Sequence, residues 1–207
     1  MGGKMRFLAK AVALSAVLSL AVPVIGAINA QQTDGAAVVQ SSAKKILVVF
    51  YTRTGNTERV GKDIARSLSA DIERIVEVER IADKKDRKGL MNSLRAGREA
   101  MKERLTDIEP IVNDPAKYDM VLIGTPIWAW NMTPAVRRYI SDNKASFKEV
   151  AFFTTSGSTK PDKIVAKMEV LSGLKARGSV GFFERDFEVE SKVIYDKKLS
   201  DFLAGLK

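Results

Sequence analysis

Residues 52–57 hold the side chains best suited to bind a ligand: Thr52, Thr54, Gly55, Asn56 and Thr57. They follow an apolar run at 46–51 and precede a helix-type pattern, so we expect a tight turn between a buried strand and a helix. The first turn of a helix offers unpaired N–H groups and the positive end of its dipole, which together favour an anion. Threonine hydroxyls add donors. The turn is therefore predicted to bind a phosphate.

This turn differs from two common phosphate loops. It lacks the Gly-Lys-Ser/Thr ending of nucleoside-triphosphate loops, and it has one glycine where a dinucleotide fingerprint has three. A monophosphate is therefore the predicted ligand. Asn56 and Thr57 would present backbone N–H groups to it, Thr52 and Thr54 would offer hydroxyls, and Gly55 would let the backbone approach. The alternative is an ordinary turn whose threonines only cap the helix.

Two further polar segments follow apolar strand patterns. The first is Gly124-Thr125-Pro126-Ile127-Trp128-Ala129-Trp130, which contains both tryptophans of the chain, and the second is Thr154-Thr155-Ser156-Gly157-Ser158. Ligands of open α/β sheets bind outside the carboxyl ends of the strands. The three segments are therefore candidates for one site.

The sequence Thr52-x-Thr54-Gly55-Asn56-Thr57 after an apolar strand resembles the FMN phosphate loop of flavodoxins and flavodoxin-like oxidoreductases. The other two segments stand where such proteins place the loops that flank the isoalloxazine ring. The resemblance covers roughly residues 44–207. It implies FMN as the cofactor, in preference to FAD. It also implies an α/β fold: a doubly wound five-stranded parallel sheet of order 2-1-3-4-5, with helices on both faces.

The resemblance also implies which residues bind the cofactor. For the phosphate these are Thr52, Arg53, Thr54, Gly55, Asn56 and Thr57, with Arg53 either pointing to solvent or supplying a counter-charge. For the ring they are Thr125, Pro126, Ile127, Trp128, Ala129, Trp130 and Asn131, and for its pyrimidine side Thr155, Ser156 and Gly157. If the second segment is extended, Trp128 and Trp130 point the same way and form one wall. The alternative for the tryptophans is that they pack in the core. The alternative for the third loop is that it is only a glycine turn followed by a helix cap.

Alternating patterns predict the elements that position these loops. We expect strands at 46–51, 71–78, 119–124, 150–154 and 178–183. We expect helices at 58–68, from Leu90 to Leu105 with one apolar stripe, from Thr133-Pro134, from Ser158 or Thr159 to about Gly173, and at 193–206. The mixed charge of the second strand is typical of a sheet edge. Residues 82–89 are expected to form a solvated loop.

The amino-acid composition limits the kinds of catalytic and metal-binding chemistry that this chain can perform. The chain of 207 residues has 45% hydrophobic and 29% charged residues, which is ordinary for a globular domain. It contains no Cys and no His. Thiol redox chemistry, Cys/His zinc sites and Ser-His-Asp units are therefore excluded, and no metal site is expected. Any redox chemistry needs an organic cofactor.

Residues 1–30 have the layout of a signal peptide: Lys4, Arg6 and Lys10, an apolar stretch from Ala11 to Ile25, then small residues up to Ala30. The alternative is an uncleaved membrane anchor. In both cases we expect the domain outside the cytoplasmic membrane, after a polar linker at 31–43. Removing residues 1–30 lowers the net charge from +9 to +6. This basic balance fits a solvated surface, an acidic partner or an anionic membrane surface.

Two functions are consistent with these observations. The first is an FMN-dependent oxidoreductase that passes reducing equivalents from NAD(P)H or a protein donor to a quinone-like acceptor. The second is a one-electron carrier. Carriers often place a tyrosine in the third loop, where it stacks on the outer face of the ring, and a glycine in the second loop, where it helps to stabilise the flavin semiquinone. Here the third loop has no tyrosine, and no glycine lies between Pro126 and Asn131. A third possibility is a domain that has lost its flavin. No nucleic acid is expected among the partners.

Overall fold

A computed structural model describes residues 44–78 and 90–206. The expected signal peptide or anchor, the linker and the expected loop at 82–89 lie outside these ranges. Residues Ser42–Lys207 form a compact unit of their own. This unit contains every helix and strand of the described residues and both of their hydrophobic clusters, so it holds what it needs to fold by itself.

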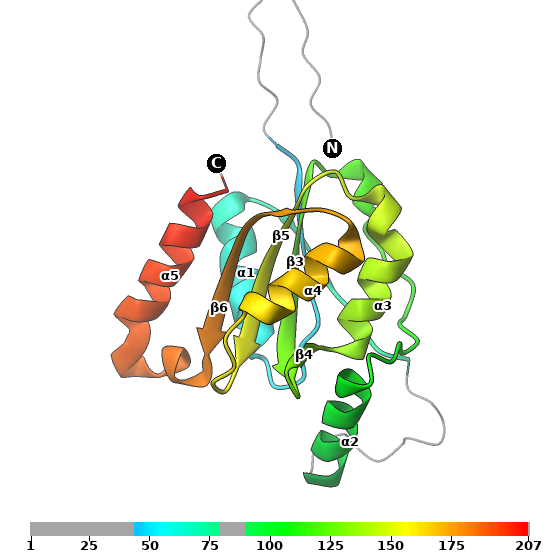
Figure 1. Ribbon diagram of the computed structural model, residues 1–207. Coiled ribbons are helices and arrows are strands. Elements are labelled where there is room, and N and C mark those ends of the chain that lie inside the picture. The colour runs from blue at the N-terminus through cyan, green and yellow to red at the C-terminus, as the bar shows by residue number, and fades with distance from the viewer. Residues whose placement is uncertain (1–43, 79–89, 207) are drawn as a thin grey trace, which may run out of the picture. The chain divides into compact units, whose positions relative to one another are not determined.

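A parallel sheet forms the centre of this unit (Figure 1). Its strands lie in the order β2-β1-β3-β5-β6, which confirms the predicted flavodoxin-like order once the short β4 is set aside. Their bounds are β1 Ile46–Phe50, β2 Asp71–Arg74, β3 Met120–Trp128, β4 Asn131–Met132, β5 Val150–Ser156 and β6 Ala176–Phe183. Strand β4 pairs antiparallel with the end of β3.

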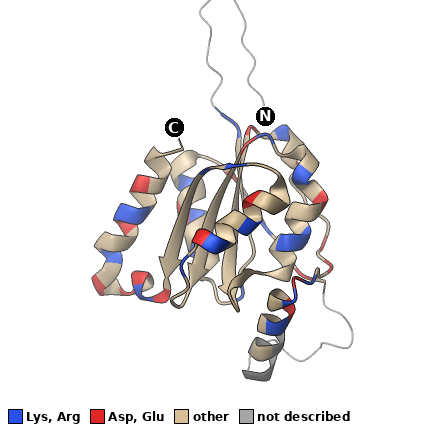
Figure 2. Ribbon diagram, in the orientation of Figure 1, with Lys and Arg blue, Asp and Glu red and all other residues tan. Residues whose placement is uncertain are grey.

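Helices cover both faces of the sheet. Their bounds are α1 Asn56–Leu68, α2 Leu90–Met101, α3 Pro134–Asn143, α4 Asp162–Ser172 and α5 Lys192–Ala204. Because side chains of a strand alternate between faces, Val49 and Ile123 join the cluster under α3 and α4, whereas Val48 and Leu122 join the cluster under α1 and α5. In Figure 2 the central strands are free of charged residues, which lie on the helices and loops.

Several elements differ from the sequence prediction: β4 is not among the expected strands, helix α2 ends at Met101 instead of Leu105, and three further elements have other bounds. The second strand ends at Arg74 instead of Val78, and beyond it Glu77 forms an isolated bridge with Ile108. The third strand continues past Gly124 to Trp128 because β5 and β4 pair with its extension. Helix α4 begins at Asp162 after Pro161, not at Ser158 or Thr159, since Pro161 presets a helical φ there.

Helix α2 packs through small residues. Ala96 and Ala100 are buried, whereas Leu94 and Met101 of the expected apolar stripe are 61% and 57% exposed. A stripe of large apolar residues normally marks the buried face of a helix. Here α2 lies against β3 and β4, and it turns Ala96 and Ala100 inward and Leu94 and Met101 outward. None of the helices within 44–78 and 90–206 is long and apolar enough to cross a bilayer.

Candidate functional site

The three predicted loops meet at the carboxyl edge of the sheet. Strands β1, β3 and β5 are neighbours, with Phe50 in register with Gly124 and Gly124 with Phe153. The three predicted segments therefore begin at about the same level of the sheet. A hydrogen bond of 2.8 Å between the hydroxyls of Thr57 and Thr155 joins the first loop to the third. Both threonines are buried, so this contact fixes the spacing of the two loops.

The first loop leaves the start of α1 open. Gly55 is the N-cap residue, its φ of 100° lies in the left-handed region that favours glycine, and no side chain caps the helix. The Gly55 N–H donates to the Thr52 hydroxyl at 3.0 Å, which closes the turn on itself. The first-turn N–H groups therefore remain available to an anion, and Asn56 stands at the first helical position.

Charges beside the first loop are balanced. Glu58, in the first turn of α1, pairs with Lys62 at 2.6 Å and lies 3.8 Å from Arg74. The hydrogen bond from Lys62 holds the pKa of Glu58 below its ordinary value, against a smaller opposing effect of desolvation. Two cations thus offset the one carboxylate near the predicted phosphate position.

The second loop is a tight hairpin rather than an extended segment. Trp128 pairs with Asn131, and the two residues between them, Ala129 and Trp130, have φ of 46° and 60°. Two consecutive positive φ values are the pattern of a type I′ turn, which usually contains glycine or asparagine. The chain therefore reverses after Trp128, and the condition for one wall of two tryptophans is not met.

The two tryptophans have different surroundings. Trp128 is half-buried against the hydrophobic core, its ring lies edge-on to Tyr51 at 5.6 Å, and the guanidinium of Arg53 lies 5.1 Å from its ring centre. Arg53 therefore stacks on Trp128, an arrangement with cation–π character. Trp130, at the tip of the hairpin, is 72% exposed.

Asn131 is held by contacts within the protein. Its Oδ1 accepts hydrogen bonds from Arg137 at 2.9 Å and from the Met132 N–H at 3.0 Å, and its Nδ2 donates to Glu103 at 3.2 Å. Arg137 is buried and also lies 3.6 Å from Glu103. Burial lowers the pKa of Arg137, while Glu103 opposes that change. Asn131 thus clamps the hairpin from a buried position.

The remaining predicted residues line up along the same edge. Thr125 is buried, and its hydroxyl donates to the Pro126 carbonyl and accepts from the Thr133 N–H at 3.2 Å. In the third loop the Ser156 hydroxyl donates to the Thr159 carbonyl, whereas Gly157 is exposed. Residues 126–129 are half-buried.

Sequence analysis did not predict Arg137 and Glu103 as part of this region. Arg137 is one of six buried residues of α3, and no motif or polar pattern in the sequence distinguishes it from an ordinary surface arginine.

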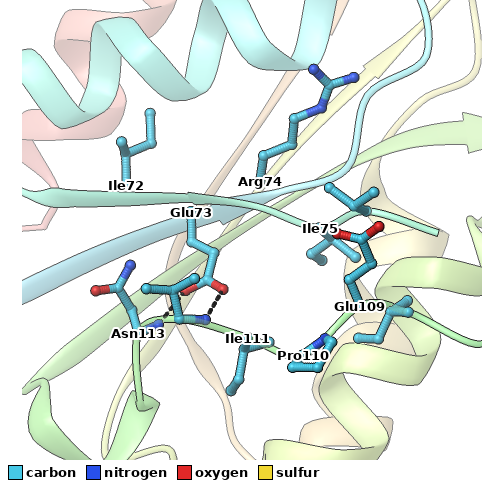
Figure 3. A pocket seen from close by; sticks show the side chains of 11 residues that line it. Ile72, Glu73, Arg74, Ile75, Glu109, Pro110, Ile111 and Asn113 are labelled. Carbon is cyan, nitrogen blue, oxygen red and sulfur yellow. Dashed lines mark hydrogen bonds between the residues drawn. The ribbon is translucent and has the colours of Figure 1, made fainter. Parts of the chain in front are cut away.

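A groove away from these loops has a structural explanation (Figure 3). It has a volume of about 300 Å³ and lies between β2 and residues 108–113. The buried carboxylate of Glu73 accepts hydrogen bonds from the N–H groups of Val112 and Asn113 at 2.7 and 2.8 Å. Glu73 thus fastens this segment alongside the edge strand, where no strand completes the sheet.

Comparison with known proteins identifies the family to which this chain belongs. The family model described as flavodoxin matches residues 45–172. The chain therefore belongs to the flavodoxin family. No curated protein matches it.

Two solved structures share the fold. A flavoprotein from Lactobacillus acidophilus NCFM, crystallised in complex with FMN, is 22% identical with a TM-score of 0.58, covering 75% of this chain and 99% of its own. A putative flavoprotein from Bacteroides eggerthii is 20% identical with a TM-score of 0.56, covering 75% and 98%.

Proposed function

We propose that this protein is an FMN-dependent oxidoreductase that passes reducing equivalents from NAD(P)H or a protein donor to a quinone-like acceptor. FMN is its cofactor, as its family and its fold indicate. The observation that carries the proposal is the uncapped start of α1 behind a glycine-closed turn, which the hydrogen bond between Thr57 and Thr155 joins to the third loop of the carboxyl edge. The same edge is where ligands of such sheets bind.

The residues present fit the cofactor. The N–H groups of the first turn of α1 and the hydroxyls of the first loop would hold the phosphate, because they are donors at the positive end of a helix. The backbone of the β3–β4 hairpin and the third loop would hydrogen-bond the polar edge of the ring. When bound, FMN supplies the electron-transfer chemistry that the side chains of this chain cannot.

One feature of the second loop favours an oxidoreductase over a one-electron carrier. The hairpin contains no glycine, and Asn131 is fastened to Arg137 and Glu103 at its base. A loop held in one conformation has little freedom to respond to the oxidation state of a neighbouring ring. The third loop also lacks an aromatic residue, which leaves space for a second substrate.

We further propose that the domain works outside the cytoplasmic membrane, either released after cleavage of residues 1–30 or tethered by them. The basic amino end, apolar stretch and small residues of that segment support this proposal. Fractionation of cells that produce the protein, with N-terminal sequencing of the recovered chain, tests it. Recovery of the uncleaved chain in the cytoplasm would contradict it.

The test of function begins with the visible absorption spectrum of the purified protein and mass spectrometry of its released cofactor. We expect flavin bands and FMN as the main species. Stopped-flow mixing with NADH or NADPH, followed by a soluble quinone, should then show reduction and reoxidation of the flavin. A reductive titration that proceeds in two separate one-electron steps, with no reduction by either nicotinamide, would favour the carrier instead. A colourless protein that takes up no FMN would refute both.

A further inference from the structure

The described large apolar side chains of helix α2 lie away from the protein. Leu94 and Met101 are 61% and 57% exposed, and Leu105, just past the helix, is 49% exposed. Within residues 44–78 and 90–206 nothing covers them. Removing large apolar side chains from water is favourable, so a partner that covered this stripe would gain free energy. Exposed apolar residues that line up in this way mark an interaction surface.

The stripe continues onto the hairpin of the flavin site. Gly97 lies between Leu94 and Met101 on the helix surface, and a Cβ built at Gly97 would be 3.6 Å from the Cβ of Ala129. Residues three and four apart share a helix face, so the stripe passes directly beside the hairpin tip. The next residue there is Trp130, which is 72% exposed and has a left-handed φ of 60°. A strained turn thus presents an indole to the outside.

Basic side chains flank the same stripe. Arg98, Lys102 and Arg104 are exposed, and they make no ion pair with another residue of the described ranges. The neighbouring carboxylate of Glu103 is engaged by Lys167 at 3.0 Å and by Arg137 at 3.6 Å, and Glu99 is half-buried. The outward charge beside the apolar stripe is therefore positive.

We propose that the α2 surface, defined as Leu94, Arg98, Met101, Lys102, Leu105 and Trp130, docks on an anionic lipid surface. Apolar side chains beside lysine and arginine are typical of helices that lie in a membrane interface, where tryptophan is also enriched. A second copy of the chain fits less well, because it would bring the same unpaired cations together. This proposal refines the proposed location outside the cytoplasm and is independent of FMN binding.

Docking would also orient the flavin site. Figure 1 shows α2 beyond the end of the sheet at which β3 and β5 end, next to β4. The loops of the candidate flavin site lie at that same end. Contact through the α2 surface therefore brings the carboxyl edge of the sheet to the lipid, where lipid-soluble acceptors of reducing equivalents are found.

The test uses the unit Ser42–Lys207, so that residues 1–41 cannot bind the vesicles. Its co-sedimentation with phosphatidylcholine vesicles is measured with and without added phosphatidylglycerol. We expect binding only when the anionic lipid is present, together with a blue shift of the tryptophan emission that Trp130→Phe removes. Raising the salt concentration should weaken the binding.

Two pairs of double variants assign the binding to this surface. Arg98→Glu with Lys102→Glu should weaken vesicle binding by about tenfold or more, since each cation near an anionic surface is worth roughly 1 kcal/mol. Lys117→Glu with Lys144→Glu changes the charge equally at exposed positions elsewhere and should change binding less. Leu94→Glu with Met101→Glu should abolish binding. The control, Val170→Glu with Val193→Glu, replaces two exposed apolar residues outside the α2 surface and should not abolish it.

Three results would overturn the proposal. The first is no binding to anionic vesicles. The second is an equal loss of vesicle binding in the α2 variants and their controls. The third is a dimer, seen in sedimentation velocity, that the double variant Leu94→Glu with Met101→Glu dissociates. Thermal unfolding of every variant confirms that it is folded. The FMN absorption of the same samples reports on the flavin site separately, so a failure of docking is distinguishable from a failure of cofactor binding.

Discussion

At the scale of single residues, Thr54 offers the clearest test of the phosphate loop. It is exposed, in contrast to buried Thr52 and Thr57, so its replacement disturbs little packing. Thr54→Glu places a negative charge against the phosphate, and two like charges about 4 Å apart cost several kcal/mol near a protein surface. We expect FMN affinity, measured by fluorescence titration, to fall at least about a hundredfold. Thr54→Gln, the uncharged control, should retain most of it; equal affinity of both variants would remove the loop from the site.

Replacing Trp128 and replacing Trp130 should have different effects on the free energy of unfolding. Trp128 packs on Tyr51, Arg53 and the core, so Trp128→Ala should lower the free energy of unfolding by roughly 2–4 kcal/mol, less than full burial would give. Trp130 is exposed, so Trp130→Ala should leave stability nearly unchanged. Urea unfolding measures both. A large loss of stability for Trp130→Ala would contradict the surroundings described for the two rings.

FMN binding is the second measurement on the same pair of variants. Added FMN should quench tryptophan emission of the apo protein, because both tryptophans lie near the predicted ring position. The variant that lacks the residue against the ring should lose affinity by on the order of 1–3 kcal/mol, by analogy with base–aromatic stacking. If neither variant changes affinity, the second loop holds the flavin through its backbone alone.

At the scale of elements, the β3–β4 hairpin carries strain that can be measured. A non-glycine residue in the left-handed region costs about 1–2 kcal/mol, and Ala129 and Trp130 both occupy it. Ala129→Gly should therefore raise stability by up to about 1 kcal/mol. Ala166→Gly, in the exposed interior of α4, should lower it by a similar amount. Thermal unfolding gives the sign of each change, and a loss in both variants would refute the strain.

The buried clamp at the base of this hairpin should contribute measurably to stability. Arg137→Met removes the donor to Asn131 and the cation beside Glu103, and it leaves a buried amide oxygen with one partner fewer. We expect a loss of about 1–3 kcal/mol in the free energy of unfolding, measured in urea. Arg138→Met, which removes the exposed pair with Asp142, should cost less than about 1 kcal/mol.

The sequence predicted the elements around the first loop well and those around the second poorly. Local patterns define the first loop: an apolar run, then Thr52 to Thr57, then the helix that buries Val60 and Ile64. The hairpin depends on pairing between Trp128 and Asn131. Its two turn residues are neither glycine nor asparagine, which are the residues from which such a turn is normally predicted. The outward stripe of α2 likewise depends on how closely a distant segment approaches, and periodicity alone does not report that distance.

At the scale of the whole molecule, titratable groups limit stability at both ends of the pH range. Hydrogen bonds and nearby cations lower the pKa of Glu58, Glu103, Asp119 and Glu169. Their contribution is present above the pKa values of the unfolded chain and is lost as the pH falls through the lower folded values. We therefore expect the melting temperature to decrease in acid. Glu103→Gln, which loses the contacts to Lys167 and Arg137, should flatten that decrease.

The alkaline limit has the opposite sign and a different cause. Burial, assisted by the hydrogen bond to Asp71, raises the pKa of Tyr118 from 10.0 to about 12. A raised pKa means that stability is present below pH 10 and is lost between there and the folded value, by roughly 2–3 kcal/mol for a shift of this size. Unfolding in urea at a series of alkaline pH values should show the loss, and Tyr118→Phe should remove much of it at a cost in stability near neutral pH. An unchanged alkaline slope in Tyr118→Phe would assign the loss to Tyr139 and Tyr195, whose pKa values burial also raises.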